Sequence, residues 1–128
     1  MTESLLWALF LAIVQMESGG RLNVINGDAV GPAQIKPVVV LDVQKWGGKV
    51  TLKDRTTLEG SYRIFKAYTD RWIAVKHLED TPKNRANIWR HGPNAKVTLK
   101  GESTKYSLKV EKLVEGGFIE TKGQKGQK

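Results

Sequence analysis

The strongest hydrophobic pattern in the chain lies near its start and ends in a carboxylate followed by two glycines. Three apolar residues and the carboxylate are spaced four, three and four residues apart along a predicted helix: Leu6, Phe10, Ile13 and Glu17. Residues at this spacing share one face of an α-helix, so Glu17 is expected to face inward. The glycines at positions 19 and 20 can take the backbone conformation that ends a helix. Thr2 or Ser4 is the expected N-cap.

The remaining pattern predicts a mainly α fold of about five helices. Further helices are expected over residues 37–46, 57–77, 82–91 and 104–116, because proline or Ser/Thr signals begin them and glycine-containing signals end most of them. Asn26-Gly27-Asp28 is a tight-turn signature inside the polar segment 21–30, which predicts a small hairpin or an irregular loop. The fold class is therefore mainly α, with a small irregular hairpin near residues 21–30.

The second and third predicted helices also carry apolar faces. In the second helix the expected buried face consists of Val38, Val39, Val40, Leu41, Val43 and Trp46. The β-branched run at 38–40 could also form a strand, but a helix is preferred because the polar residues 42, 44 and 45 fall on one side. On the long third helix, Phe65 and Trp72 are expected in the core.

Composition limits the architecture and the chemistry. The 128 residues, 40% of them hydrophobic, predict one domain over residues 1–117, followed by a disordered basic tail at 118–128. With no cysteine and only two histidines, in no zinc-binding spacing, neither a metal nor another cofactor is expected. The apolar run at residues 5–14 has no basic flank and is too short for a bilayer, so neither a signal peptide nor a membrane span is predicted.

The net charge of +8 is unevenly distributed. Residues 1–35 carry a net −2, whereas residues 36–128 carry +10. A basic surface of this kind attracts polyanions such as nucleic acid, anionic lipid or an anionic wall polymer. The charge does not distinguish among them.

Two motifs in the first third of the chain resemble a known family. Glu17-Ser18 ends the predicted first helix, and Gly31-Pro32-Ala33-Gln34-Ile35 follows after a loop. This order resembles the lysozyme-like family of soluble lytic transglycosylases and goose-type lysozymes, in which Glu-Ser ends a helix and a Gly-x-x-Gln-Ile element follows. The resemblance implies a lysozyme-like domain with a sugar-binding cleft and with Glu17 as its catalytic residue.

A second pair of segments extends the resemblance over roughly residues 8–113. Residues 86–94 and 103–110 are similar to the closing motif of small transglycosylase-type domains, many of them from bacteriophages. Those domains have Asn-Gly before Gly-Pro, and this chain has Arg90-His91. The family's Asn generally binds sugar, and an Arg can donate but not accept a hydrogen bond. Arg90 could still bind an N-acetyl carbonyl or a peptide-stem carboxylate.

The resemblance implies cleavage of the MurNAc-β-1,4-GlcNAc bond of peptidoglycan. Most glycosidases need two carboxyls, but lytic transglycosylases use one Glu and let the substrate's C6 hydroxyl attack, which gives a 1,6-anhydro sugar. A carboxyl on an apolar stripe can hold a proton near neutral pH and serve as the acid. The expected substrate-binding residues are Ser18, Asp28, Gln34, Tyr68, Arg90 and Tyr106. Asp28 is the weak candidate for a second carboxyl. The alternative role of Ser18 is to cap its helix, and the alternative for either tyrosine is an ordinary core position.

The expected partner is the peptidoglycan glycan strand, bound by a monomer that needs no nucleic acid. The protein is expected to be made in the cytoplasm and to act on the bacterial wall as a lysis enzyme, a virion component or a cellular remodelling enzyme. Two other classes stay open: a wall-binding module with impaired catalysis, suggested by Arg90, and a basic helical nucleic-acid binder. The second is disfavoured because the basic residues are not gathered on one recognition helix. A Ser-His-Asp hydrolase is disfavoured because the sequence has no Gly-x-Ser-x-Gly elbow.

Overall fold

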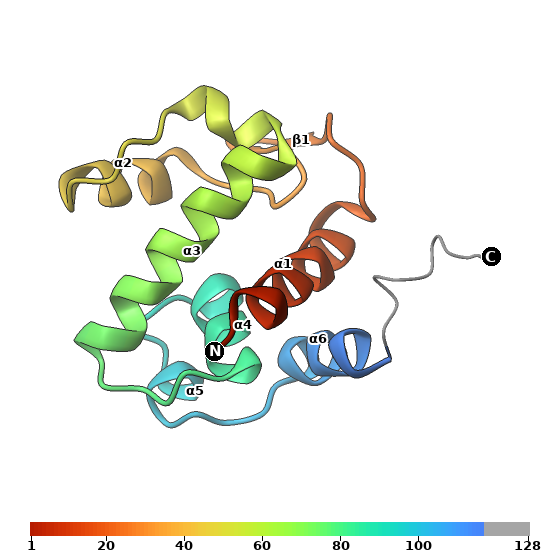
Figure 1. The fold of residues 1–128 in the computed structure, drawn as a ribbon, viewed down its shortest axis with the longest axis vertical. Coiled ribbons are helices and arrows are strands. Elements are labelled where there is room, and N and C mark those ends of the chain that lie inside the picture. Colours follow the sequence, from red (N-terminus) through yellow and green to blue (C-terminus); the bar gives the residue numbers. More distant parts are fainter. Residues whose placement is uncertain (117–128) are drawn as a thin grey trace. The chain divides into compact units, whose positions relative to one another are not determined.

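The computed structural model describes residues 1–116 and shows a mainly α protein with one small antiparallel hairpin (Figure 1). The predicted fold class is confirmed, whereas the predicted disordered tail at 118–128 lies outside the described residues. The elements in chain order are α1 (Glu3–Ser18), β1 (Ile25–Asn26), β2 (Ala29–Val30), α2 (Pro37–Lys45), the 3-10 helix η1 (Leu52–Thr56), α3 (Leu58–Val75), α4 (Pro82–His91), α5 (Lys96–Leu99) and α6 (Lys105–Glu115).

The chain divides into two compact units. The Glu17 unit is Ile13–Arg71, and the Arg90 unit is Met1–Ala12 together with the described residues from Trp72 onward. Helices α1 and α3 each begin in one unit and end in the other. No described helix is both long enough and apolar enough to cross a bilayer.

The Glu17 unit combines the end of α1, the hairpin, α2, η1 and most of α3. Its largest fully buried side chains are Ile13, Ile35, Val40, Val43, Ile64 and Phe65, so the core position predicted for Phe65 is confirmed. The hairpin pairs Ile25 with Val30 and Asn26 with Ala29. Gly27 has a φ of 63° at the first central position of the two-residue turn, as a type II′ turn requires.

Helix α2 forms where it was predicted, but its buried face is narrower. Pro37 occupies the first helical turn, where its missing N–H costs nothing. Val40 and Val43 are buried, whereas Val38 and Leu41 are 57% and 58% exposed, so the prediction that they belong to the buried face is wrong. Two residues along an α-helix rotate the side chain by about 200°. The 38/41 pair therefore points away from the face that carries 40 and 43.

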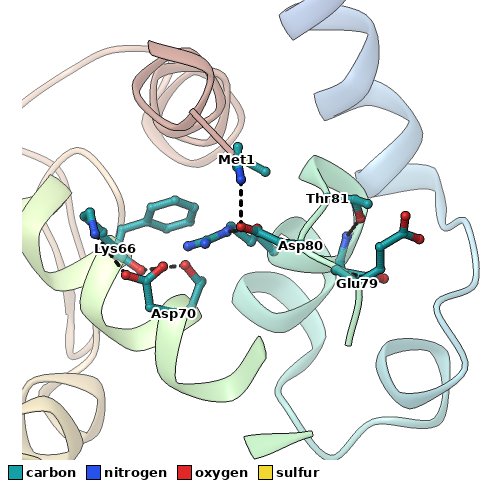
Figure 2. Close-up of polar contacts among 10 residues, drawn as sticks. Met1, Lys66, Asp70, Glu79, Asp80 and Thr81 are labelled. Carbon is teal, nitrogen blue, oxygen red and sulfur yellow. Dashed lines mark hydrogen bonds and ion pairs between the residues drawn. The ribbon is translucent and has the colours of Figure 1, made fainter. Parts of the chain in front are cut away.

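The Arg90 unit is built on α4, which packs against α5 and α6. The predicted N-cap of α4 is confirmed, since Thr81 Oγ1 accepts a hydrogen bond from Asn84 N at 3.1 Å (Figure 2). Thr104 caps α6 in the same way, accepting from Ser107 N at 3.0 Å. The four-residue helix α5 was not predicted. Trp72, expected in the core, is half-buried.

A buried asparagine joins these helices. Asn87 Nδ2 donates to the carbonyl of Glu102 at 2.7 Å, and Asn87 Oδ1 accepts from Thr104 Oγ1 at 3.2 Å. Thr98 Oγ1 donates to the main-chain oxygen of Asn87 at 3.3 Å. The Asn87 side chain thereby bonds on both its donor and its acceptor side, which is the condition for burying an amide without a large penalty.

The first helix of the chain is anchored by polar contacts at its start. Thr2 is its N-cap, since Thr2 Oγ1 accepts from Leu5 N at 3.1 Å. The Met1 ammonium donates to Asp80 Oδ2 at 3.1 Å, and Arg85 Nε donates to Asp80 Oδ1 at 2.8 Å (Figure 2). The hydrogen bond from Arg85 is the main reason why the pKa of Asp80 is lowered from its ordinary value, and the Met1 ammonium acts in the same direction.

Candidate functional site

Glu17 lies in the last turn of α1, as predicted. The three apolar residues of its stripe, Leu6, Phe10 and Ile13, are 3%, 0% and 0% exposed, and Glu17 itself is half-buried. Gly19 and Gly20 have φ values of 66° and 87°, and this left-handed backbone ends the helix just after the carboxylate. The carboxylate therefore stands at the border between core and solvent, at the end of a rigid element.

Ser18 is held by the helix that carries it. Its side chain is buried, and Ser18 Oγ donates to the carbonyl of Val14 at 3.1 Å. This bond uses the only hydroxyl proton, so Ser18 can meet a ligand only as an acceptor. The carbonyl of Ser18 accepts from Arg21 Nε at 2.9 Å. A cation at a helix C-terminus is favourable because it faces the negative end of the helix dipole.

Arg21 was not among the predicted site residues. It is the one basic residue in positions 1–35 and comes four residues after Glu17, and this isolation in a mildly acidic segment was a usable signal. Its guanidinium orders the chain directly after the helix that presents Glu17.

Gln34 braces the loop that follows the hairpin. Its backbone has a φ of 54°, in the left-handed region that residues other than glycine rarely adopt. Gln34 Nε2 donates to the carbonyls of Val24 and Gly31 at 3.0 and 2.9 Å, and Gln34 Oε1 accepts from Asn26 Nδ2 at 2.7 Å. Both amide protons are thus used within the protein. The predicted role of Gln34 in sugar binding stays a prediction, and only its oxygen retains capacity to accept a further bond.

Steric crowding explains why the same motif has a glycine at position 31. Gly31 has a φ of 87°, and a Cβ added there would lie 1.7 Å from the main-chain oxygen of Arg55. No side chain fits at this position. Gly31 is therefore required where this loop passes against the main chain at Arg55.

Arg55 clamps both ends of the hairpin region and was also missed by the sequence patterns. Arg55 Nη1 donates to the carbonyls of Asp28 and Ile35 at 3.2 and 3.1 Å, and Arg55 Nε donates to the carbonyl of Leu52 at 3.0 Å. The two Nη1 acceptors flank the Gly31–Gln34 stretch. One guanidinium therefore fixes the hairpin turn and the end of the loop to η1.

The other two candidates in the Glu17 unit lie in different surroundings. Asp28 is exposed in the hairpin turn and bonds to Arg55 through its main-chain oxygen. Tyr68, on α3, is only 9% exposed, and its ring lies 5.9 Å from that of Trp46. The Arg71 guanidinium lies 5.5 Å from the same Trp46 ring. Tyr68 thus has the surroundings of a core tyrosine at the edge of an aromatic cluster.

Arg90 and Tyr106 belong to the Arg90 unit, where they lie together. Arg90, at the end of α4, places its guanidinium carbon 5.5 Å from the centre of the Tyr106 ring on α6, a cation–π distance. Their predicted position in one cleft with Glu17 stays a prediction.

The described residues contain no group of three or more His, Cys, Asp or Glu side chains that could hold a metal ion. Comparisons with protein-family models, with curated proteins and with solved structures give no match to this chain. The functional argument therefore rests on the residues and the contacts described above.

Proposed function

We propose that this chain cleaves the glycan strand of peptidoglycan, at the MurNAc-β-1,4-GlcNAc bond, as a lytic transglycosylase with Glu17 as its acid and base. Its partner would be the bacterial wall polymer, met during phage lysis, from a virion or in cellular wall remodelling. The support comes from the position of one carboxylate, from the braced loop that follows in the chain, and from the likeness of both motifs to the lysozyme-like family.

The observation that carries the proposal is the Gly31–Ile35 loop, in which side-chain hydrogen bonds hold Gln34 in a left-handed backbone conformation. A non-glycine residue in the left-handed region costs about 1–2 kcal/mol, and three side-chain hydrogen bonds hold Gln34 there. Backbone strain that the surroundings over-determine clusters at active sites and ligand sites. The same loop supplies the Gly-x-x-Gln-Ile motif that, with Glu17-Ser18, resembles the family.

The other carboxylates of the Glu17 unit favour a mechanism with one carboxyl. Asp54 pairs with Arg63 at 3.0 Å, and Asp70 pairs with Lys66 at 3.0 Å (Figure 2). Asp28 lies on the exposed hairpin turn. Asp42 is half-buried on α2, and Glu59 is exposed in the first turn of α3. Of these carboxylates, only Glu17 lies at the end of a helix, just before the two left-handed glycines at positions 19 and 20.

In the proposed reaction Glu17 first gives its proton to the glycosidic oxygen, and the bond from C1 to that oxygen breaks. The C6 hydroxyl oxygen of the same sugar then bonds to C1, and its proton passes to the Glu17 carboxylate. The enzyme returns to its starting state without consuming water. The product is a 1,6-anhydro sugar at one new end and a free hydroxyl at the other.

The test is Glu17→Gln, with mass spectrometry of the soluble fragments released from purified wall. The amide keeps the shape but has no proton to give, so cleavage should fall by about 10²–10⁴-fold, the usual contribution of a general acid. The matched control is Glu59→Gln, which changes an exposed glutamate in the first turn of α3.

The expected wild-type fragments are lighter by one water than hydrolysed ones. Cleavage by Glu17→Gln above about a tenth of the wild-type rate would remove Glu17 from this role. Wall binding by the wild-type protein without any released fragment would replace the proposal by a binding function.

A further inference from the structure

A separate pocket lies wholly within the Arg90 unit. Its volume is about 420 Å³, and its walls come from the turn after α3, the start of α4, the end of α5 and one residue of α6. This volume falls in the range of small-molecule sites, roughly 300–1,000 Å³, and is far larger than a single ion needs. None of the residues discussed for the glycan site lines it.

One residue in the wall of the pocket carries a buried acceptor that no other described residue satisfies. Asn84 is 5% exposed, and its Nδ2 donates to the carbonyl of Glu79 at 2.8 Å. Among the described residues, Asn84 Oδ1 has no hydrogen-bond partner. A Cβ added at Gly101 would lie 3.4 Å from Oδ1, so this oxygen lies against the Gly101 turn, which also lines the pocket. Buried amide oxygens are nearly always bonded, and the missing donor is what a ligand can supply.

The charges around this acceptor have both signs. Lys83 and Lys100 line the pocket together with Glu79 and Glu111. Lys83 and Asn84 also stand in the first turn of the ten-residue helix α4, where the helix dipole favours an anionic group. Glu79 and Thr81 mark the approach to this turn in Figure 2.

The mixed charges that line the pocket disfavour several classes of ligand. Polyphosphates and nucleic acids would meet two carboxylates as well as two ammonium groups, which weakens their attraction. An apolar ligand would bury the charged walls without compensation. A ligand that matches the unsatisfied acceptor and both signs of charge carries an N–H donor, a carboxylate and an ammonium group.

The geometry points to a binding site for a short peptide with free ends. An N–H of the peptide bonds to Asn84 Oδ1, the carboxylate lies toward Lys83, Lys100 and the start of α4, and the ammonium lies toward Glu79 and Glu111. A free dipeptide carries all three groups, and the stem peptide of peptidoglycan shares its N–H donors and its free carboxylate. The site does not depend on Glu17, so it can exist whether or not the chain cleaves glycan.

The test is a titration of the ¹⁵N-labelled full chain with alanyl-alanine, followed by the side-chain amide signal of Asn84. Saturable shifts of that signal are expected with the free dipeptide, and weaker binding with the N-acetylated and the C-amidated forms. Lys100→Gln should raise the Kd about tenfold, the usual effect of losing one charge-assisted contact. The control is Lys96→Gln, which removes an exposed lysine of α5, the helix directly before Lys100, and lies outside the pocket, so it should leave the Kd unchanged.

A second titration, with a soluble muropeptide that carries the stem peptide, distinguishes the two possible sources of the ligand. If both probes bind and both bind more weakly to Lys100→Gln, the pocket is a general peptide site. If only the muropeptide binds, and it binds more weakly to Lys100→Gln, the ligand is the wall peptide. Equal binding of free and blocked dipeptides, an equal effect of Lys96→Gln, or no shift with either probe would overturn the inference. Glu17→Gln should bind the probes like wild type, so failure of the glycan proposal does not imply failure of this one.

Discussion

Replacing the Arg55 clamp should loosen one identifiable part of the Glu17 unit. Arg55→Met keeps the aliphatic stem but removes three donated hydrogen bonds at 3.0–3.2 Å. Hydrogen bonds to charged groups contribute about 1.5–3 kcal/mol when shielded. Only the bond to Ile35 is partly buried, whereas those to Asp28 and Leu52 are exposed and add little. We expect a loss of about 2–3 kcal/mol, which for a chain of this size lowers Tm by roughly 10 °C.

The assay combines thermal unfolding with amide hydrogen exchange. Val30 and Ile35 bond to each other through both main-chain amides at 3.1 Å, and these two amides report directly on the segment that Arg55 fixes. In Arg55→Met they should exchange faster than the core amides of α3. The matched control is Arg63→Met, whose ion pair with Asp54 is 53% exposed on the arginine side and should contribute about 0–1 kcal/mol.

Two results would refute this reasoning about the clamp. One is a Tm change in Arg55→Met no larger than in Arg63→Met. The other is faster exchange spread evenly over the unit instead of being concentrated at Val30 and Ile35. Either would show that the hairpin and its loop are held by their own hydrogen bonds without the guanidinium.

Three other side chains give predictions that need only purified variants. Arg90→Ala should lower glycan cleavage roughly ten- to a hundredfold if the guanidinium contacts substrate, and a gain in activity would show that it obstructs. His77→Gly should raise the free energy of unfolding by up to about 1 kcal/mol in urea titrations, because His77 has a φ of 54° in the turn after α3. A lower free energy of unfolding would contradict this. The pKa of Asp80 is lowered chiefly by Arg85, so its contribution to stability is present above about pH 4 and is lost as the pH falls through the lower folded value. Asp80→Asn should remove that part of the acid dependence in unfolding measured from pH 2 to 7, and an unchanged profile would contradict it.

The helix ends could be predicted because their signals are local. Thr81 with Pro82, and Thr104 with Ser107, act within one turn of the helix that they begin. A cap is a bond between residues three apart, so the sequence alone contains both partners. The position of Glu17 followed in the same way from helical spacing and from the two glycines after it.

The clamp and the pocket could not be predicted, because their parts are distant in sequence. Arg55 bonds to carbonyls 20 and 27 residues away, and any residue type offers such a carbonyl. The pocket joins residues from 77 to 111. Helix α5 has only four residues, too few for a periodic signal. Val38 and Leu41 were misplaced because a run of apolar residues does not say which of two faces the core takes.

Gly31 and Gln34 are needed for structural reasons, and this limits which variants can test catalysis. Gly31 is required because the chain passes against the Arg55 carbonyl, and Gln34 because its amide bonds hold a left-handed backbone. Substitution of either should unfold the loop, and activity would then be lost whatever the role of these residues toward sugar. Glu17→Gln leaves those bonds in place. We therefore expect a variant of Glu17 to lose cleavage and keep its fold, and a variant of Gln34 to lose both cleavage and the fold of the loop. This pair of outcomes would distinguish a catalytic residue from a structural one.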